Sequence, residues 1–218
     1  MHSVDQAVDQ LLQACEVLAH PVPTALPDVL GRVLAEDVVA EIDVPPADNS
    51  AMDGYAFRHA DRTSADRPLA ISQRIPAGIA PPALQAGTAA RIFTGAEIPE
   101  GADTVVMQEH CEASEDGVLI RKLPEPGKNI RRRAQDVSVG QTVLHAGVKI
   151  RPQDSGLIAS LGIATVSAFR PLKVAVISNG SELVEPGEPV QPGQIYNSNR
   201  YLLCGLMAAW GFEVIDMG

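Results

Sequence analysis

The pattern that most constrains the fold is a series of short apolar runs between about residues 47 and 133, separated by segments rich in proline and glycine. The runs are Tyr55–Phe57, Leu69–Ile71, Ala90–Phe93, Thr104–Met107 and Val118–Ile120. Runs this short, divided by such breakers, are typical of strands bounded by turns. The sequence therefore predicts a compact β domain here, with Tyr55–Phe57 as a half-buried strand.

Helical patterns precede and follow this region. Ser3 and Gln6 fit a capping box, and the apolar residues after them recur at helical spacing. They are Val4, Val8, Leu11, Leu12, Cys15 and Leu18 or Ala19. A second helix is predicted to begin at Pro152 and to end at Gly162. We expect it to pack with the first helix, whose apolar face would form a core or a subunit contact.

The last part of the chain predicts one βαβ unit. The continuous apolar run Val174–Ile177 is typical of a strand buried on both faces of a parallel sheet. Ser198-Asn199 can cap a helix that ends at Gly211, and residues 212–217 form the next strand. The helix residues expected to face inward are Tyr201, Leu202, Leu203, Leu206, Met207 and Trp210.

Charge and cysteine content exclude several classes of protein. The net charge of −10 argues against a nucleic-acid partner, because such binding depends on a basic face. No apolar run is long enough to cross a bilayer, so no membrane partner is expected. Cys15, Cys111 and Cys204 are far apart, which suits a reducing cytoplasm better than a disulfide framework or a zinc site.

Asp53 is the first candidate for chemistry. It lies between Met52 and Gly54, immediately before a predicted strand, whereas Asp48-Asn49-Ser50 are explained by turn formation. A carboxylate beside a glycine at the mouth of a strand is a candidate for metal or phosphate-site chemistry. The alternative is an aspartate that caps its own turn.

Two further side chains stand at the ends of predicted strands. Thr94, beside Gly95, could offer a hydroxyl and a backbone N–H to an anion, although it could also be an ordinary hairpin threonine. Glu182 follows Val174–Ile177 at the carboxyl end of a parallel strand, where ligands bind in such sheets. Its alternative is a glutamate on a surface loop.

The basic run Lys128–Arg133 could contact phosphate or protect an edge strand by its charge.

Three stretches of the sequence resemble signatures of the molybdopterin molybdenumtransferase family, which includes the gephyrin E domain. They are Asp43–Ala56, Arg91–Glu109 and Ser178–Leu183. The family usually has an aromatic residue where this chain has Ala47, and Gly-Glu-Asp where it has Ala134-Gln135-Asp136. The matches together cover nearly the whole chain, and the sequence is identified as similar to this family.

The resemblance implies an α+β multidomain fold. Residues 1–45 and 137–168 would form an elongated first domain of mixed structure, into which a small β domain, residues 46–136, is inserted. Residues 169–218 would be the first βαβ unit of an incomplete α/β domain of the molybdopterin-binding kind. Family members continue well beyond this length, so we expect an N-terminal fragment.

The resemblance also implies a function in molybdenum cofactor biosynthesis. Family members transfer molybdenum from molybdate to adenylylated molybdopterin and release AMP, with Mg²⁺ as the usual device for neutralising phosphate charge. The signatures carry the family's functional residues onto Asp53, Thr94 and Glu182, with Asp53 and Glu182 as metal or water ligands. A cytoplasmic homodimer with a site shared between subunits is implied, and the molybdopterin adenylyltransferase of the same pathway is a candidate partner.

Two other interpretations stay open. Gephyrin-like relatives use this architecture for assembly, so the chain could be a non-catalytic dimerisation scaffold. A weaker interpretation assigns the βαβ unit to an adenylyltransferase of the same pathway, but such enzymes resemble single α/β domains without the inserted β domain. For the transferase interpretation, we expect the 218-residue chain to be inactive alone.

Overall fold

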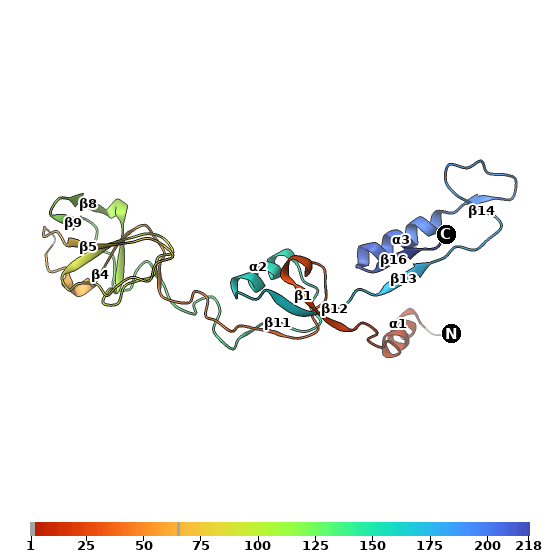
Figure 1. The fold of residues 1–218 in the computed structure, drawn as a ribbon, viewed down its shortest axis with the longest axis horizontal. Helices are drawn as coiled ribbons and strands as arrows, with labels where there is room; N and C mark the ends of the chain where they lie inside the picture. Colours follow the sequence, from red (N-terminus) through yellow and green to blue (C-terminus); the bar gives the residue numbers. More distant parts are fainter. Residues whose placement is uncertain (1–2, 65) are drawn as a thin grey trace. The chain divides into compact units, whose positions relative to one another are not determined.

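A computed structural model describes residues 3–64 and 66–218. The chain is a mixed α/β protein with few helices and many strands, and it separates into two compact units (Figure 1). One unit comprises Met1–Val38 and Leu144–Gly218, and the other, the β unit, comprises Val39–Val143. The chain passes between them at β2 (Val38–Val39) and β11 (Thr142–Leu144).

The β unit is built on a four-stranded sheet in the order β5-β6-β4-β7. The strands are β4 (Gly54–Phe57), β5 (Ala70–Ile75), β6 (Thr88–Ile92) and β7 (Thr104–Met107). The central strand β4 is antiparallel to both β6 and β7, whereas β5 is parallel to β6. The predicted strands of this region are confirmed, with ends that differ by one to a few residues.

The sheet is covered on both faces. Tyr55 and Phe57 belong to one buried apolar cluster, and Ala56 belongs to a second cluster that also contains Ile75 and Ile92. Successive strand residues point to opposite faces, so two clusters on one strand mean two packed faces. All of β4 is buried, and the prediction of a half-buried strand is wrong because apolar clusters cover both faces of the sheet at this strand.

Shorter elements complete the β unit. β8 (Cys111–Ser114) and β9 (Gly117–Ile120) form a hairpin, and β3 (Asn49–Ser50) pairs antiparallel with β10 (Ile130–Arg131). Two 3-10 turns, η2 (His59–Asp61) and η3 (Gln108–His110), follow β4 and β7. The β3–β10 pair brings the basic run beside the turn that leads into Asp53.

The other unit begins with α1 (Val4–Gln13), which has the predicted Ser3–Gln6 capping box. None of its residues is buried, so its apolar face forms no core within this chain. β1 (Pro21–Ala25) pairs with β12 (Thr165–Phe169), and α2 (Pro152–Ser160) packs against η1 (Leu26–Asp28). The partner of α2 is therefore a short turn after β1, rather than the predicted surface of α1, which leaves the apolar stripe of α1 exposed.

The final segment contains the predicted parallel pair. β13 (Lys173–Val176) pairs with β16 (Glu213–Asp216), and α3 (Ser198–Trp210) connects them after a small β14 (Leu183–Val184) and β15 (Ile195–Tyr196) ladder. Asn197 caps α3, one residue earlier than predicted, and Gly211 ends it with a left-handed backbone, as expected of glycine.

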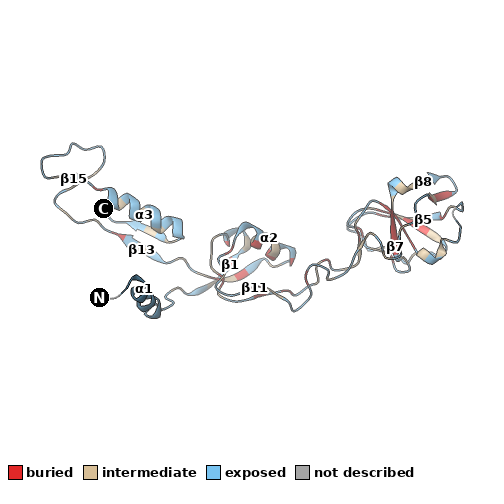
Figure 2. Ribbon diagram, turned by 180° about the vertical axis from the view of Figure 1, so that it is seen from behind, coloured by how far each residue is buried: buried red, intermediate tan, exposed pale blue. Residues whose placement is uncertain are grey.

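Burial in this segment is less than the sequence predicts. In β13 only Val176 is buried, and Ile177 just after it is 70% exposed. No residue of α3 is buried, and Tyr201, Leu202 and Trp210 are mostly exposed (Figure 2). Two strands present too little surface to bury a helix of this length, so α3 contacts β13 and β16 while most of its predicted inward positions stay exposed.

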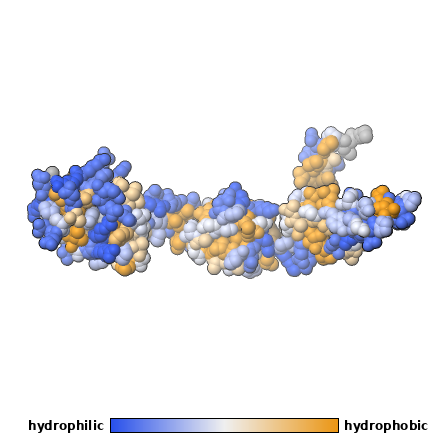
Figure 3. Space-filling view, turned by 90° about the horizontal axis from the view of Figure 1, so that it is seen from above, coloured by the Kyte–Doolittle hydropathy of each residue, from blue (hydrophilic) through white to orange (hydrophobic). Residues whose placement is uncertain are grey.

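Surface hydropathy repeats this contrast. In Figure 3 the β unit, at the left, shows a mainly hydrophilic face, whereas larger hydrophobic patches lie on the rest of the chain. Within residues 3–64 and 66–218, no helix is long and apolar enough to span a bilayer. The three cysteines are free thiols.

Candidate functional site

The loop before β4 holds Asp53 at the end of the central strand. The buried Ser50 hydroxyl donates to the Met52 carbonyl at 2.6 Å, which closes the turn. Gly54 follows, and a Cβ there would lie 1.8 Å from the Val106 carbonyl oxygen on β7. Only glycine permits this approach of two backbones, so Gly54 holds Asp53 close to the β7 side of the sheet.

Thr94 binds the Asp53 carboxylate through two donors. The backbone N–H and the hydroxyl of Thr94 donate to Asp53 Oδ1 at 2.8 and 2.7 Å. These two bonds lower the pKa of Asp53 below its ordinary value of 3.8, with a smaller contribution from the positive charge of Arg91. Asp53 is exposed, and within the described residues no hydrogen bond reaches Oδ2, so one oxygen of the ionised carboxylate has no partner in this chain's described part.

Arg91 is a neighbour of this pair that the sequence reasoning missed. Its guanidinium donates to the Gly54 carbonyl at 2.8 Å and to Gln108 Oε1 at 2.6 Å. It also lies over the rings of Tyr55 and Phe93. Its position at the start of the second signature, on the strand that leads to Thr94, was the available signal.

The basic run is neutralised by carboxylates within the β unit. Arg131 pairs with Asp136, Arg132 with Asp48 and Arg133 with Asp43. Each arginine therefore has an acidic partner, and two of these partners lie in the first signature. This local ion pairing disfavours an open phosphate-binding patch, which is one of the two interpretations that the sequence left open.

Glu182 lies in the other unit, on an exposed loop between β13 and β14. Its carboxylate folds back toward Gly180, since a Cβ on that glycine would lie 2.6 Å from Glu182 Oε2. Its backbone carbonyl accepts the Ile195 N–H at 2.8 Å. Glu182 therefore lies beyond the carboxyl end of β13, as the parallel-sheet argument predicts.

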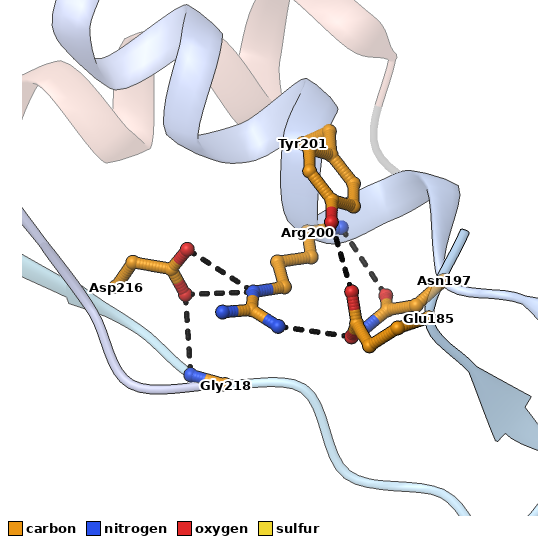
Figure 4. Close-up of polar contacts among 6 residues, drawn as sticks. All are labelled: Glu185, Asn197, Arg200, Tyr201, Asp216 and Gly218. Carbon is orange, nitrogen blue, oxygen red and sulfur yellow. Dashed lines mark hydrogen bonds and ion pairs between the residues drawn. The ribbon is translucent and has the colours of Figure 1, made fainter. Parts of the chain in front are cut away.

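A polar network borders the Glu182 loop (Figure 4). Arg200 on α3 contacts Glu185 at 2.9 Å and Asp216 at 2.8 Å. Asn197 and Tyr201 donate to the two oxygens of Glu185. We call these five residues the Arg200 network. The sequence reasoning missed it, although Asn197-Ser198-Asn199-Arg200 is a dense polar run at a helix start.

The structure brings Asp53 and Thr94 together, and it places Glu182 in a different unit. In the part of the chain that the structure describes, no three His, Cys, Asp or Glu side chains converge as a metal site would require. The carboxylate oxygen of the exposed Asp53 that accepts no hydrogen bond within the described residues can serve as a single oxygen ligand. The arrangement suits a hard cation whose remaining ligands are waters or phosphate oxygens, as is usual for Mg²⁺.

The fold and site define a class: a strand-rich unit with a hydroxyl-bound aspartate at the end of its central strand, followed by the start of a parallel α/β unit. Comparison with known proteins names it. Residues 2–162 match the model of the MoeA N-terminal region, domains I and II. The chain belongs to this family, which confirms the family predicted from the three signatures.

Relatives with this architecture carry consistent names. The molybdopterin molybdenumtransferase of Haemophilus influenzae is 42% identical over all of this chain, which spans 54% of that protein. Molybdopterin molybdenumtransferase 2 of Mycobacterium tuberculosis is 43% identical over 99% of the chain and is likewise covered over 54% of its length. The chain therefore spans about half the length of these relatives.

A solved structure has the same fold. The molybdopterin biosynthesis MoeA protein of Pyrococcus horikoshii OT3 superposes with a TM-score of 0.87 at 36% identity. The match covers 98% of this chain and 58% of that one.

Proposed function

We propose that this chain is the N-terminal part of an enzyme of molybdenum cofactor biosynthesis that transfers molybdenum from molybdate to adenylylated molybdopterin. The transfer breaks the phosphoanhydride of the adenylylated substrate, releases AMP and leaves the metal on the dithiolene sulfurs. Two observations support the proposal: the relatives are named molybdopterin molybdenumtransferases, and their sequences match this chain over all or nearly all of its length. Because the chain spans about half of each relative, we expect it to show no turnover alone.

The observation that carries the proposal is the Asp53–Thr94 pair. Two hydrogen bonds hold Oδ1 and keep the carboxylate ionised, while no hydrogen bond within the described residues reaches Oδ2. An ionised carboxylate with one oxygen free is suited to a cation or to a nucleophilic water. We assign Asp53 to that role and Thr94 to orienting it and to a hydrogen bond with substrate.

The residues fit Mg²⁺ as the ion at Asp53. Bound there, Mg²⁺ would neutralise charge on the phosphoanhydride oxygens. A single carboxylate is enough when water and substrate phosphate complete the octahedron. Glu182, at the carboxyl end of β13, would supply a second carboxylate to the cation or to a water.

Asp53 and Glu182 belong to different units, and we propose that a homodimer brings them to one site, with the β unit of one chain facing the α/β part of its partner. The exposed apolar face of α1 supports a subunit contact, since Val4, Leu11 and Leu12 are each mostly exposed. The molybdopterin adenylyltransferase of the pathway is the proposed source of substrate, and the three free thiols suit a cytoplasmic location.

The predicted three-part division accompanies this proposal: residues 1–45 with 137–168, the inserted β domain 46–136, and the α/β start 169–218. Two observations support it. The matching family model describes domains I and II and ends at residue 162, and the β unit, Val39–Val143, lies in sequence between the two halves of the other unit.

The test uses the full-length protein and measures molybdate-dependent AMP release from adenylylated molybdopterin. Asp53→Asn removes the charge and keeps the shape, and we expect the rate to fall at least about a hundredfold, the scale on which a positioned ionic group acts in catalysis. Asp116→Asn, at the exposed β8–β9 turn, is the matched control and should retain the normal rate. A normal rate in Asp53→Asn would refute the catalytic assignment.

The alternative, a non-catalytic assembly scaffold, rests on the same exposed apolar faces of α1 and α3. It predicts that the full-length protein dimerises but releases no AMP. Measuring both properties on one preparation separates the two functions.

A further inference from the structure

We propose that Arg200 is a positioning residue, which acts on the reaction by holding the loop that carries Glu182. This inference rests on the proposed function, because it assigns Arg200 a role only through Glu182. None of the three sequence signatures includes Arg200. Its positioning role is inferred from its contacts alone.

The Glu182 side chain depends on its loop for its position. Within the described residues, its carboxylate has no hydrogen-bond or ion-pair partner. The loop that begins there is closed by backbone bonds, from the Ile195 N–H to the Glu182 carbonyl at 2.8 Å and from the Asn197 N–H to the Val184 carbonyl at 2.9 Å. A ladder of two residues per strand, none of them buried, stabilises the loop only weakly by itself.

Arg200 connects this loop to two other elements. One side of its guanidinium contacts Glu185, three residues after Glu182, and the other contacts both oxygens of Asp216, at 2.8 and 3.1 Å. Asp216 ends β16, where its carboxylate also accepts the Gly218 N–H at 3.1 Å. A single side chain on α3 thus joins the loop, the helix and the carboxyl end of the parallel sheet (Figure 4).

The two carboxylates need this arginine. Glu185 and Asp216 are like charges on either side of one guanidinium, and they would repel each other without it. The Arg200 side chain is only 22% exposed, so its ion pairs are less screened than those of a fully exposed arginine. Because both acids already neutralise it, Arg200 is not a free anion-binding group, which leaves positioning as its role.

Lysine cannot replace this geometry. A guanidinium presents a planar fork that contacts two carboxylates in different directions, whereas an ammonium is a point charge on a flexible stem. Arg200→Lys should therefore keep the charge and only part of the function. Arg200→Met keeps the stem and removes every ionic contact.

The kinetic test uses the full-length protein. We expect Arg200→Met to lower kcat about 10- to 100-fold, the usual cost of losing a residue that orients a catalytic group, with little change in KM. Arg200→Lys should recover part of that loss. The control is Lys173→Met, which breaks the exposed Lys173–Glu213 pair at the other end of β13 and β16 and should leave kcat unchanged.

A structural measurement accompanies it. Hydrogen exchange should accelerate about tenfold or more at the Ile195 and Asn197 amides in Arg200→Met, because local opening of the loop becomes easier. Lys173→Met should leave both amides as protected as in the parent. Unchanged exchange in Arg200→Met would overturn the proposal, whatever the kinetics show.

A double-mutant cycle decides whether Arg200 acts through Glu182. If it does, the double variant Arg200→Met with Glu182→Gln should be no slower than Glu182→Gln alone. Once Glu182→Gln has removed the carboxylate, misplacing that side chain lowers the rate no further. Losses that multiply would overturn the positioning role. A normal rate in Glu182→Gln alone would instead refute the proposed function of Glu182, and the amide exchange would still test what Arg200 holds.

Discussion

The β unit and the α/β segment hold their candidate residues by different physical means. Asp53 lies immediately before the first residue of β4, a strand that is buried on both faces between two apolar clusters. Glu182 stands on a loop beside a two-stranded sheet whose helix has no buried residue. A packed strand supports the backbone of Asp53, whose carboxylate is held by Thr94, whereas ion pairs and hydrogen bonds of the Arg200 network position the loop of Glu182.

The half of the proposed site that contains Asp53 is therefore the preorganised half. Packed interiors are dense and resist displacement, so the Asp53–Thr94 geometry should persist in the 218-residue chain alone. The Glu182 loop depends on a few partly shielded ion pairs and hydrogen bonds rather than on a packed core, so it should be the less ordered of the two regions.

Gly54→Ala should have the largest effect. Its Cβ would lie 1.8 Å from the Val106 carbonyl oxygen, and relief requires β4 and β7 to separate. We expect the β unit to lose more than about 4 kcal/mol of unfolding free energy, the range reserved for such clashes. Hydrogen exchange resolved by peptide measures each unit separately.

Gly78→Ala is the matched control for that change. Gly78 has a φ of +86° but open space around its missing side chain. Gly78→Ala should lower the free energy of unfolding only by the backbone strain of an alanine at positive φ, about 1–2 kcal/mol. If both variants lose equal stability, the close approach of β4 to β7 does not constrain the β unit.

A pair of isoleucines compares the two regions directly. Ile92 on β6 is fully buried, whereas Ile177 after β13 is 70% exposed. Ile92→Ala should cost about 2–5 kcal/mol because it leaves a cavity. Ile177→Ala should stay within about 0.5 kcal/mol, as at other surface positions. Urea unfolding of the two variants checks this, and equal costs would show that the apolar surface beyond β13 is already packed in this chain.

The strands of the β unit were predictable because each is a short apolar run bounded by segments rich in proline and glycine, so the length of the run indicates the approximate length of the strand. The contact between Asp53 and Thr94 was not, although both residues were candidates. They are 41 residues apart, and only the pairing of β4 with β6 brings them together. Sequence patterns identify strand ends, but they do not determine which strands are neighbours.

The errors have a different cause. The apolar residues of α3 and the run Val174–Ile177 correctly identified a helix and a strand, but most of the residues predicted to be buried are partly or largely exposed in the described structure. Periodicity shows which face of an element is apolar, and it cannot show whether the partner lies within 218 residues. The Arg200 network was missed because its acids, Glu185 and Asp216, are 31 residues apart in the sequence.

Thiol reactivity compares the same two regions without a substitution. Burial among the apolar residues of the β unit raises the pKa of Cys111 to about 11 from 9.0, whereas Cys15 is exposed. That rise lowers the thiolate fraction about a hundredfold at neutral pH, and the thiolate is the reactive form. Cys111 should react with a disulfide reagent about 100-fold more slowly than an exposed thiol of ordinary pKa. Similar rates at Cys111 and Cys15, followed by mass spectrometry, would mean that the β unit opens readily.

Thr94→Val should have the smallest effect on stability and the most informative effect on the site. It removes the hydroxyl donor to Asp53 and keeps the backbone N–H donor, so the pKa of Asp53 should rise toward 3.8 without reaching it. A lowered carboxyl pKa contributes stability that is present above the unfolded pKa and is lost as the pH falls through the folded pKa. The variant should therefore lose less stability than the parent on acidification below about pH 4.

Titration of the Asp53 carboxyl carbon by NMR measures the shift in its pKa. The control is Thr88→Val, because Thr88 lies on β6 but its hydroxyl bonds Ser72. An Asp53 pKa that does not move would mean that the hydroxyl contact is not made in solution, and Thr94 would then lose its role as the group that leaves Oδ2 free for a ligand.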